Sequence, residues 1–307
     1  MNYSNLHYER LIEKECRLLG KSGGPLFRVL NSPWKASSIT ESRVTDTNFT
    51  EDQRDMPPGL EGIAVHRYPD RLLVFATNRC FQRCTYCCRP TIDATDLNNE
   101  KIDRIIAYLG RHCEIQEVIL SGGDPLTSSD DVLEHVLSRV SNESDIRSFR
   151  IHTRGPVYEP QRVTHRFIRI ITKYEVRIAL HVVHPYELSP ETVDVILQFK
   201  QAGISMFNQF PILRGINDHR DVVEMLLRNL AGLGVVTTSI YAPEPVGKSF
   251  QYRVSLERVF RITDSLKDDL PSWLASFNVC LDTPIGKVRR IHIKHYDATS
   301  NLSLIHI

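Results

Sequence analysis

Short apolar runs alternate with longer amphipathic segments over most of the chain, and this alternation restricts the fold more than any other feature of the sequence. The runs are rich in β-branched residues, which is typical of buried strands, whereas the longer segments have the periodicity of helices. The predicted strands are Leu72–Ala76, Val118–Leu120, Phe149–His152, Ile178–Val183, Met206–Leu213 and Val235–Tyr241. The predicted helices are Asn98–His112, Asp130–Val140, Val163–Tyr174, Pro190–Ala202, Arg220–Leu233 and Leu256–Leu266, with Asn98, Ser129, Ser189 and Asp218 as expected caps.

Strands that alternate with helices predict an α/β fold with a parallel sheet. Polar motifs follow several different strands, which favours a barrel, since all strand ends then face one mouth. We therefore expect a partial (β/α)6 TIM-like barrel at residues 63–270. Residues 1–62 are polar and charged with a break at Pro57-Pro58-Gly59, which indicates an N-terminal helical extension. Residues 271–307 are expected to form a short C-terminal segment.

The composition argues against nucleic acid and membranes as partners. The chain has 38 lysines and arginines against 37 acidic residues, so no global positive field favours nucleic acid or anionic lipid. No stretch approaches the roughly 20 apolar residues that span a bilayer, and the charged N-terminus lacks the apolar core of a signal peptide. The chain has seven cysteines, but a chain of this size does not need disulfides for stability. We expect a soluble, cytoplasmic protein.

Three of these cysteines form a C-x3-C-x2-C motif, Cys80, Cys84 and Cys87, on the loop after the first predicted strand. Three thiolates can hold a [4Fe-4S] cluster and leave its fourth iron open. An open iron can chelate the amino and carboxylate groups of S-adenosylmethionine (SAM) and pass an electron to its sulfonium. The spacing therefore favours a radical SAM enzyme.

A zinc site is the alternative for the same cysteines, because C-x2-C pairs in intracellular proteins often bind zinc. Such a site needs a fourth ligand, for which Cys88 and His112 are the candidates. The position of the motif directly after a strand, with Tyr86 before its last cysteine, favours the cluster. Adjacent cysteines rarely reach one metal centre together, so Cys88 is expected not to be a ligand.

Six motifs occur in a fixed order between His66 and Lys287. They are HRYPDR (66–71), the cysteine motif followed by Arg89, LSGGDPL (120–126), RIHTR (150–154) with Pro156-Val157, His184-Pro185 with Glu187, and Asn208-Gln209 followed by LRGIND (213–218). Together and in this order, they resemble the lysine 2,3-aminomutase family of radical SAM enzymes. The resemblance covers most of the chain.

The resemblance implies residues that bind SAM. Its amino group is expected at the segment Ser121, Gly122, Gly123 and Asp124, where the glycines allow the backbone to approach a ligand closely. An ordinary strand–helix turn is the alternative for this segment. Arg154 is expected at the carboxylate or ribose of SAM, and an ion pair across the barrel mouth is its alternative.

The resemblance also implies pyridoxal 5′-phosphate (PLP). Arg67, Arg71 and Gln209 are expected to hold its phosphate, a role that suits guanidinium groups, and Lys287 is expected to form the Schiff base. Arg289 and Arg290 beside Lys287 are expected either to lower the pKa of its amine or to form a basic surface turn with it.

The implied activity is that of an isomerase, a radical 2,3-aminomutase that moves the α-amino group of a basic amino acid from C2 to C3. Arg89 is expected to bind the substrate α-carboxylate, and Glu244 and Asp282 are expected to bind a distal ammonium, which favours L-lysine. Arginine, glutamate and the lysine aminomutase that serves elongation factor P are alternatives within the class. A zinc-binding protein without enzymatic activity is the alternative from another class.

The resemblance implies an electron donor of the flavodoxin or ferredoxin type and a homo-oligomer. Family members continue well past the PLP lysine, whereas this sequence ends 20 residues after Lys287. Leu302–Ile307 also reads like a translated transposon end. We therefore expect the natural chain to be longer.

Overall fold

A computed structural model describes residues 6–20, 22–31, 55–87, 96–243, 247–283, 286–297 and 302–305. Its main feature is a nine-stranded sheet whose strands follow one another in chain order, from β1 to β9. The strands are β1 (Ala64–Tyr68), β2 (Arg71–Thr77), β3 (Glu117–Gly122), β4 (Ser148–Thr153), β5 (Val176–Leu180), β6 (Met206–Pro211), β7 (Val235–Tyr241), β8 (Asn278–Thr283) and β9 (Gly286–Arg289). Strands β2 to β8 are parallel, and β1 and β9 are antiparallel to their neighbours.

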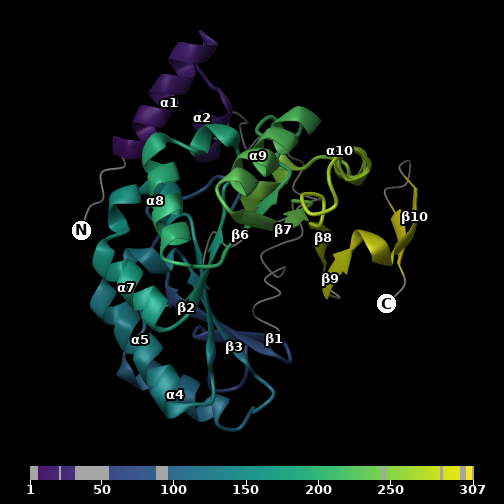
Figure 1. The fold of residues 1–307 in the computed structure, drawn as a ribbon. Helices are drawn as coiled ribbons and strands as arrows, with labels where there is room; N and C mark the ends of the chain where they lie inside the picture. The colour runs from purple at the N-terminus through teal and green to yellow at the C-terminus, as the bar shows by residue number, and fades with distance from the viewer. Residues whose placement is uncertain are drawn as a thin grey trace.

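Helices cover one face of this curved sheet, and Figure 1 shows α4, α5, α7 and α8 stacked along its outer side. The helices are α1 (Leu6–Leu19), α2 (Pro25–Leu30), α4 (Asn99–Leu109), α5 (Asp130–Glu143), α6 (Gly155–Tyr158), α7 (His165–Lys173), α8 (Pro190–Gln201), α9 (Arg220–Gly232) and α10 (Leu256–Asp269). The six predicted strands and six predicted helices are present, so the α/β fold with a partial barrel is confirmed. Strands β1, β8 and β9 of this sheet were not predicted from the sequence.

Side-chain caps mark where α4, α5, α7, α8 and α10 begin, and three of these caps were predicted. Asn98, Ser129 and Ser189 each accept a hydrogen bond from a backbone N–H in the first turn of α4, α5 and α8, as predicted. The expected cap at Asp218 is wrong, because α9 begins after His219, which makes no side-chain cap. Asp218 Oδ1 instead accepts from Gly215 N at 2.8 Å, within the preceding loop. The Asp218 carboxylate therefore accepts from a backbone N–H in its own loop and does not cap α9.

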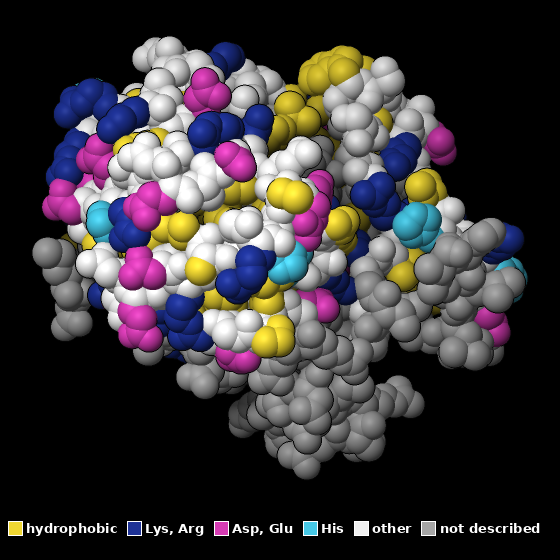
Figure 2. All heavy atoms as spheres, turned by 90° about the horizontal axis from the view of Figure 1, so that it is seen from below, with side chains coloured by type: hydrophobic (Ala, Val, Ile, Leu, Met, Phe, Trp, Pro, Cys, Tyr) yellow, Lys and Arg dark blue, Asp and Glu magenta, His cyan; other side chains and the backbone are white. Residues whose placement is uncertain are grey.

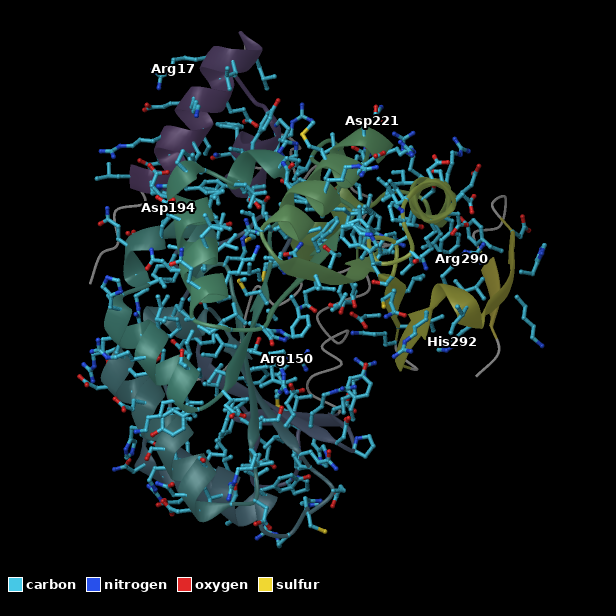
Figure 3. The ribbon with its side chains drawn as sticks, viewed as in Figure 1. Arg17, Arg150, Asp194, Asp221, Arg290 and His292 are labelled. Carbon is cyan, nitrogen blue, oxygen red and sulfur yellow. The ribbon has the colours of Figure 1, made fainter. Side chains whose placement is uncertain are left out.

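The two faces of the sheet differ in polarity. Along β4, Phe149, Ile151 and Thr153 are buried, while Arg150 and His152 between them stay partly exposed. Because successive side chains of a strand point to opposite faces, the first set packs under the helices and the second lines the concave side. Figure 3 shows Arg150 on the side of the sheet away from α5 and α7, where it pairs with Glu117 of β3 at 2.6 Å. The concave side of β3 and β4 therefore carries polar groups, whereas Leu73 and Phe75 of β2 form a small apolar cluster apart from the main core.

The N-terminal helices lie beside the barrel (Figure 1). Tyr8 of α1 and Val29 of α2 are fully buried, and Arg28 Nη1 donates to Gly215 O at 2.8 Å. The extension predicted at 1–62 thus contributes two helices packed on the barrel. At the other end of the chain, β8 and β9 continue the same sheet, and β10 (Ile293–Asp297) pairs with β11 (Leu302–Ile305).

The charge distribution on the surface and the length of the helices concern two expected absences, nucleic acid and membrane as partners. On the face in Figure 2, Lys and Arg side chains are interspersed with Asp and Glu, so this face presents no field of one sign. Among the described residues, no helix combines the length and the apolar character needed to cross a bilayer.

Candidate active site

The cysteine loop begins where β2 ends, at the carboxyl ends of the parallel strands. Cys80 is exposed at its start, and Cys84 and Cys87 are half-buried. Although the residue as a whole is exposed, neighbouring protein atoms partly shield its sulfur from water, which raises the pKa of the Cys80 thiol to about 12; the Asp124 carboxylate and the other two sulfurs add to the shift. The three cysteines are therefore close enough to influence one another electrostatically.

The backbone of this loop is held by segments far away in the sequence. Thr85, between Cys84 and Cys87, donates its N–H to Val29 O at 2.9 Å, at the end of α2. The Thr85 hydroxyl lies 2.7 Å from the Tyr252 hydroxyl, at the end of the 3-10 helix η7 (Gly247–Tyr252). The N-terminal helices thus help to fix the cysteine loop.

The Ser121–Asp124 segment packs its backbone directly against the start of the cysteine loop. Gly123 N donates to Thr77 O and Asp124 N donates to Arg79 O, both at 2.7 Å. A Cβ on Gly123 would lie 2.1 Å from Arg79 O, and Gly122 has a φ of +103° that favours glycine. The glycines are therefore required by contact between two loops of the protein.

Asp124 is committed to bonds within the protein. Its Oδ1 accepts from Leu126 N at 3.0 Å and from the Thr153 hydroxyl at 2.7 Å, and its Oδ2 accepts from Arg154 N at 2.8 Å. Burial raises the pKa of this carboxyl, and the hydrogen bonds oppose the rise. Asp124 thus ties the end of β3 to the end of β4.

Arg154 forms the ion pair across the barrel mouth that was its alternative role. Its Nη2 is 2.6 Å from Oε1 of Glu187, at the end of the 3-10 helix η6 (Pro185–Glu187), and both side chains are buried. Its Nη1 donates to the Tyr86 hydroxyl and to His181 O, both at 2.6 Å. Glu187 also accepts from the Tyr8 hydroxyl at 2.9 Å. Burial opposes the charge on Arg154, but Glu187 keeps the pKa of the guanidinium well above its ordinary value.

Lys287 lies in the β8–β9 hairpin opposite Asp282. Its Nζ donates to the Tyr241 hydroxyl at 2.9 Å and lies 3.9 Å from Asp282 Oδ1. Burial lowers the pKa of the amine, but Tyr241, Asp282 and Tyr68 more than offset this, so the pKa is raised.

The expectation that Arg289 and Arg290 lower the pKa of Lys287 is therefore wrong. Figure 3 shows Arg290 beside α10, where its guanidinium covers the Phe260 ring at 4.4 Å and pairs with Asp264 at 3.4 Å. Arg289 is exposed on the surface. The Arg290 charge is therefore directed at α10 and not at the amine of Lys287.

The expected phosphate ligands come from three strands. Arg71, at the start of β2, lies over the Tyr68 ring at 4.3 Å, and Tyr68 is near enough to affect Lys287. Arg67 lies 3.7 Å from Asp55. Gln209 of β6 is 3.4 Å from His152 and 3.5 Å from the Tyr241 hydroxyl. Gln209 and Lys287 thus share Tyr241 as a contact, and Arg71 contacts Tyr68.

Several expected residues lie outside the described part of the chain or away from the site. Cys88, Arg89 and Glu244 fall in the segments that the structure does not describe. His112 lies between α4 and β3, at the amino ends of the strands, where it bonds to Glu114 at 2.8 Å. The length of β2 separates that end from the cysteine loop by about 20 Å. His112 therefore does not complete a zinc site.

No three histidine, cysteine or acidic side chains of the described residues are placed to bind one metal ion together. A cluster does not require such a group, since each of its cysteines binds a different iron.

Three aromatic or basic side chains of the mouth were not predicted from the sequence. Tyr158 approaches Cys84 Sγ to 3.0 Å, Tyr241 contacts Lys287, and His181 stacks on Tyr86 with ring centroids 6.1 Å apart. Burial lowers the pKa of His181 to about 3, so the ring is neutral. Tyr241 ends β7, His181 directly follows β5, and Tyr158 ends the short helix after β4; position near a strand end is the signal in the sequence that marks them.

The sequence of this chain matches a family model and several known proteins. A model of the Radical SAM superfamily matches residues 74–228, a stretch that contains the three cysteines. The chain is 32% identical over 235 residues to a putative L-lysine 2,3-aminomutase of Aquifex aeolicus, covering 75% of this chain and 62% of that protein. It is 30% identical over 277 residues to a glutamate 2,3-aminomutase of Clostridioides difficile, covering 84% of this chain and 65% of that protein. The chain thus spans less than two thirds of the length of these relatives.

Solved structures agree on the fold. The chain superposes on Streptococcus suis SuiB, in its complex with the precursor peptide SuiA, with a TM-score of 0.55 over 88% of this chain and 61% of SuiB. The sequence identity is 14%, so this likeness concerns the fold alone.

We expect Glu187→Gln to lower the free energy of unfolding by about 3–5 kcal/mol, because it leaves the buried Arg154 charge without its counterion. Urea unfolding measures the loss. Glu257→Gln is the matched control, since Glu257 forms an exposed pair with Arg261 and should cost about 1 kcal/mol or less. Equal losses in the two variants would contradict a special role for the buried pair.

Proposed function

Since the chain belongs to the radical SAM superfamily, we propose that it is a 2,3-aminomutase that moves the α-amino group of a basic amino acid from C2 to C3. The observation that carries the proposal is the cysteine loop at the carboxyl ends of the strands, fixed by the rest of the protein. The similarity to aminomutases at about 30% identity gives the reaction class.

The residues present fit a [4Fe-4S] cluster. Cys80, Cys84 and Cys87 form no disulfide and share one loop at the barrel mouth. The loop is anchored by Thr85, by the Ser121–Asp124 segment and by Tyr86, so contacts with the rest of the protein hold it in position. In the proposal these three thiolates hold three irons, and the fourth iron is left to SAM.

In the proposal, SAM and PLP bind to different sets of residues. Ser121, Gly122 and Gly123 meet SAM through their backbone, while Asp124 and Arg154 hold that segment and the mouth in shape. Lys287, Gln209, Arg67 and Arg71 hold PLP on the concave face. When bound, the cofactors supply the radical that removes hydrogen from C3 and the carbonyl group that carries the nitrogen.

The charge state of Lys287 sets a condition for PLP attachment. An amine reacts with an aldehyde only when it has lost its proton, and the raised pKa keeps Lys287 protonated at neutral pH. Tyr241, which accepts from the amine, and Asp282 are the groups placed to take up that proton.

The substrate in the proposal is a basic amino acid, with L-lysine favoured. Asp282 Oδ1 is buried and makes no hydrogen bond within the described residues, although the Lys287 amine lies 3.9 Å away. A buried carboxylate oxygen of this kind has capacity for a substrate ammonium. Glu244 and Arg89 complete the proposed substrate contacts. An electron donor of the flavodoxin or ferredoxin type and a homo-oligomer also belong to the proposal.

We expect Cys80→Ala, Cys84→Ala and Cys87→Ala each to lose the cluster, because each removes one of three iron ligands. Iron and sulfide content after anaerobic reconstitution measures this, together with the visible absorption of the cluster. Cys88→Ala and the exposed Cys113→Ala are controls that should keep about four irons per chain. Loss in the Cys88 variant with retention in one of the three would show that the ligand set is different.

Lys287 should carry the pyridoxyl group after incubation with PLP and borohydride reduction, as peptide mapping would reveal. The rate of attachment should rise with pH, because the raised pKa leaves little neutral amine near pH 7. Asp282→Asn removes a negative charge beside the amine, so it should lower that pKa and shift the profile to lower pH. The exposed Lys294 is the control position, and finding the label there would refute the assignment.

Anaerobic incubation with SAM, PLP and a reductant should convert L-lysine to a β-amino acid faster than L-arginine, L-glutamate or L-alanine. Glu244→Gln and Asp282→Asn should each raise the KM for lysine about tenfold or more, because each removes a charge-assisted hydrogen bond. Asp268→Asn, at an exposed acid of α10, is the control. A preference of the wild type for glutamate or alanine would overturn the proposed substrate class.

A further inference from the structure

Tyr158 lies beside one of the three cysteines and has no role in the proposed function. It ends α6, the short helix after β4, and its side chain is 2% exposed. Its hydroxyl oxygen is 3.0 Å from Cys84 Sγ, which is hydrogen-bonding distance for a sulfur partner. Among the described residues, Cys84 is the hydrogen-bond partner that the structure gives this hydroxyl.

The direction of this hydrogen bond follows from the chemistry of the two groups. A cysteine bound to iron is a thiolate and has no proton to donate. A tyrosine keeps its phenolic proton at neutral pH, since its ordinary pKa is about 10. With the cluster bound, Tyr158 is therefore the donor and Cys84 is the acceptor.

The surroundings of Tyr158 hold its hydroxyl in place. The Tyr8 ring packs edge-on against it with centroids 4.8 Å apart, and the Arg154 guanidinium lies 4.6 Å from its centroid. Arg154 is fixed in turn by Glu187. A buried donor that cannot turn away acts on the sulfur in both oxidation states of the cluster.

We propose that Tyr158 is a positioning residue that raises the reduction potential of the cluster by donating a hydrogen bond to the Cys84 thiolate. Adding one electron makes the cluster and its sulfurs more negative, so the hydrogen bond is stronger in the reduced form. Hydrogen bonds to cluster sulfurs are among the factors that set these potentials. The inference rests on the proposed function only in that it needs a cluster on Cys84.

Tyr158→Phe tests the inference because it removes the hydroxyl and keeps the ring. The measurement is an anaerobic redox titration of the reconstituted full chain without SAM, followed by the electron paramagnetic resonance signal of the reduced cluster. At a fixed potential we expect the ratio of reduced to oxidised cluster to fall about tenfold, which is about 59 mV for one electron. Iron content is measured on every sample.

Tyr8→Phe is the matched control. It removes a neighbouring buried hydroxyl that donates to Glu187 and not to a sulfur, so the potential should stay at the wild-type value. An equal shift in both variants would overturn the inference, since it would indicate general loosening of the mouth.

Replacement of Tyr158 by 3-fluorotyrosine covers the case in which Tyr158→Phe fails to fold or to hold iron. The more acidic phenol is a stronger donor and keeps the ring and hydroxyl, so the potential should rise. A cluster with full iron content and an unchanged potential would overturn the inference and leave the proposed function intact. A wild-type protein that takes up no cluster would instead overturn the proposed function, and with it the inference.

Discussion

The buried ion pair between Arg154 and Glu187 holds together the segments that form the mouth of the barrel. Removing two charges from water costs several kcal/mol, so such a pair needs further hydrogen bonds to be stable. Arg154 obtains them from Tyr86 and His181 O, and Glu187 obtains them from Tyr8 and Val183 N. The pair therefore joins the end of β4, the cysteine loop, the end of β5 and helix α1. Several independent bonds thus support the mouth at which the cysteines lie.

Backbone contacts give the same loop a second support. Gly123 lets the end of β3 approach the residues that follow β2, and Asp124 then ties β3 to β4. The alternation along β4 adds the third element, since its residues under the helices are mostly apolar and Arg150 and His152 on the concave side are polar. A loop held by the rest of the protein thus stands at the mouth of the barrel, near polar side chains of β3 and β4. Such an arrangement suits chemistry in which the protein positions its cofactors and excludes water.

Motifs predicted which segments meet at the site better than they predicted what each side chain does there. The order of the motifs indicated Asp124 and Arg154 at the mouth, and both lie there. Their partners, Thr153 and Glu187, are 29 and 33 residues away, so their engagement within the protein was not readable from spacing. The same holds for Asp218, whose carboxylate bonds to Gly215 instead of capping α9. A side chain's role depends on which donors lie nearest in space.

The sequence by itself determined the strand and helix pattern, three of the four expected caps and the grouping of the three cysteines, because each depends on residues close together in the chain. Only the tertiary structure decided that α1 and α2 support the cysteine loop and that Tyr158 reaches Cys84 from 74 residues away. It also decided the charge of Lys287, since Tyr241, Asp282 and Tyr68 surround the amine while Arg290 turns to α10. Electrostatic effects act through space and burial, and neither distance nor burial is written in local sequence.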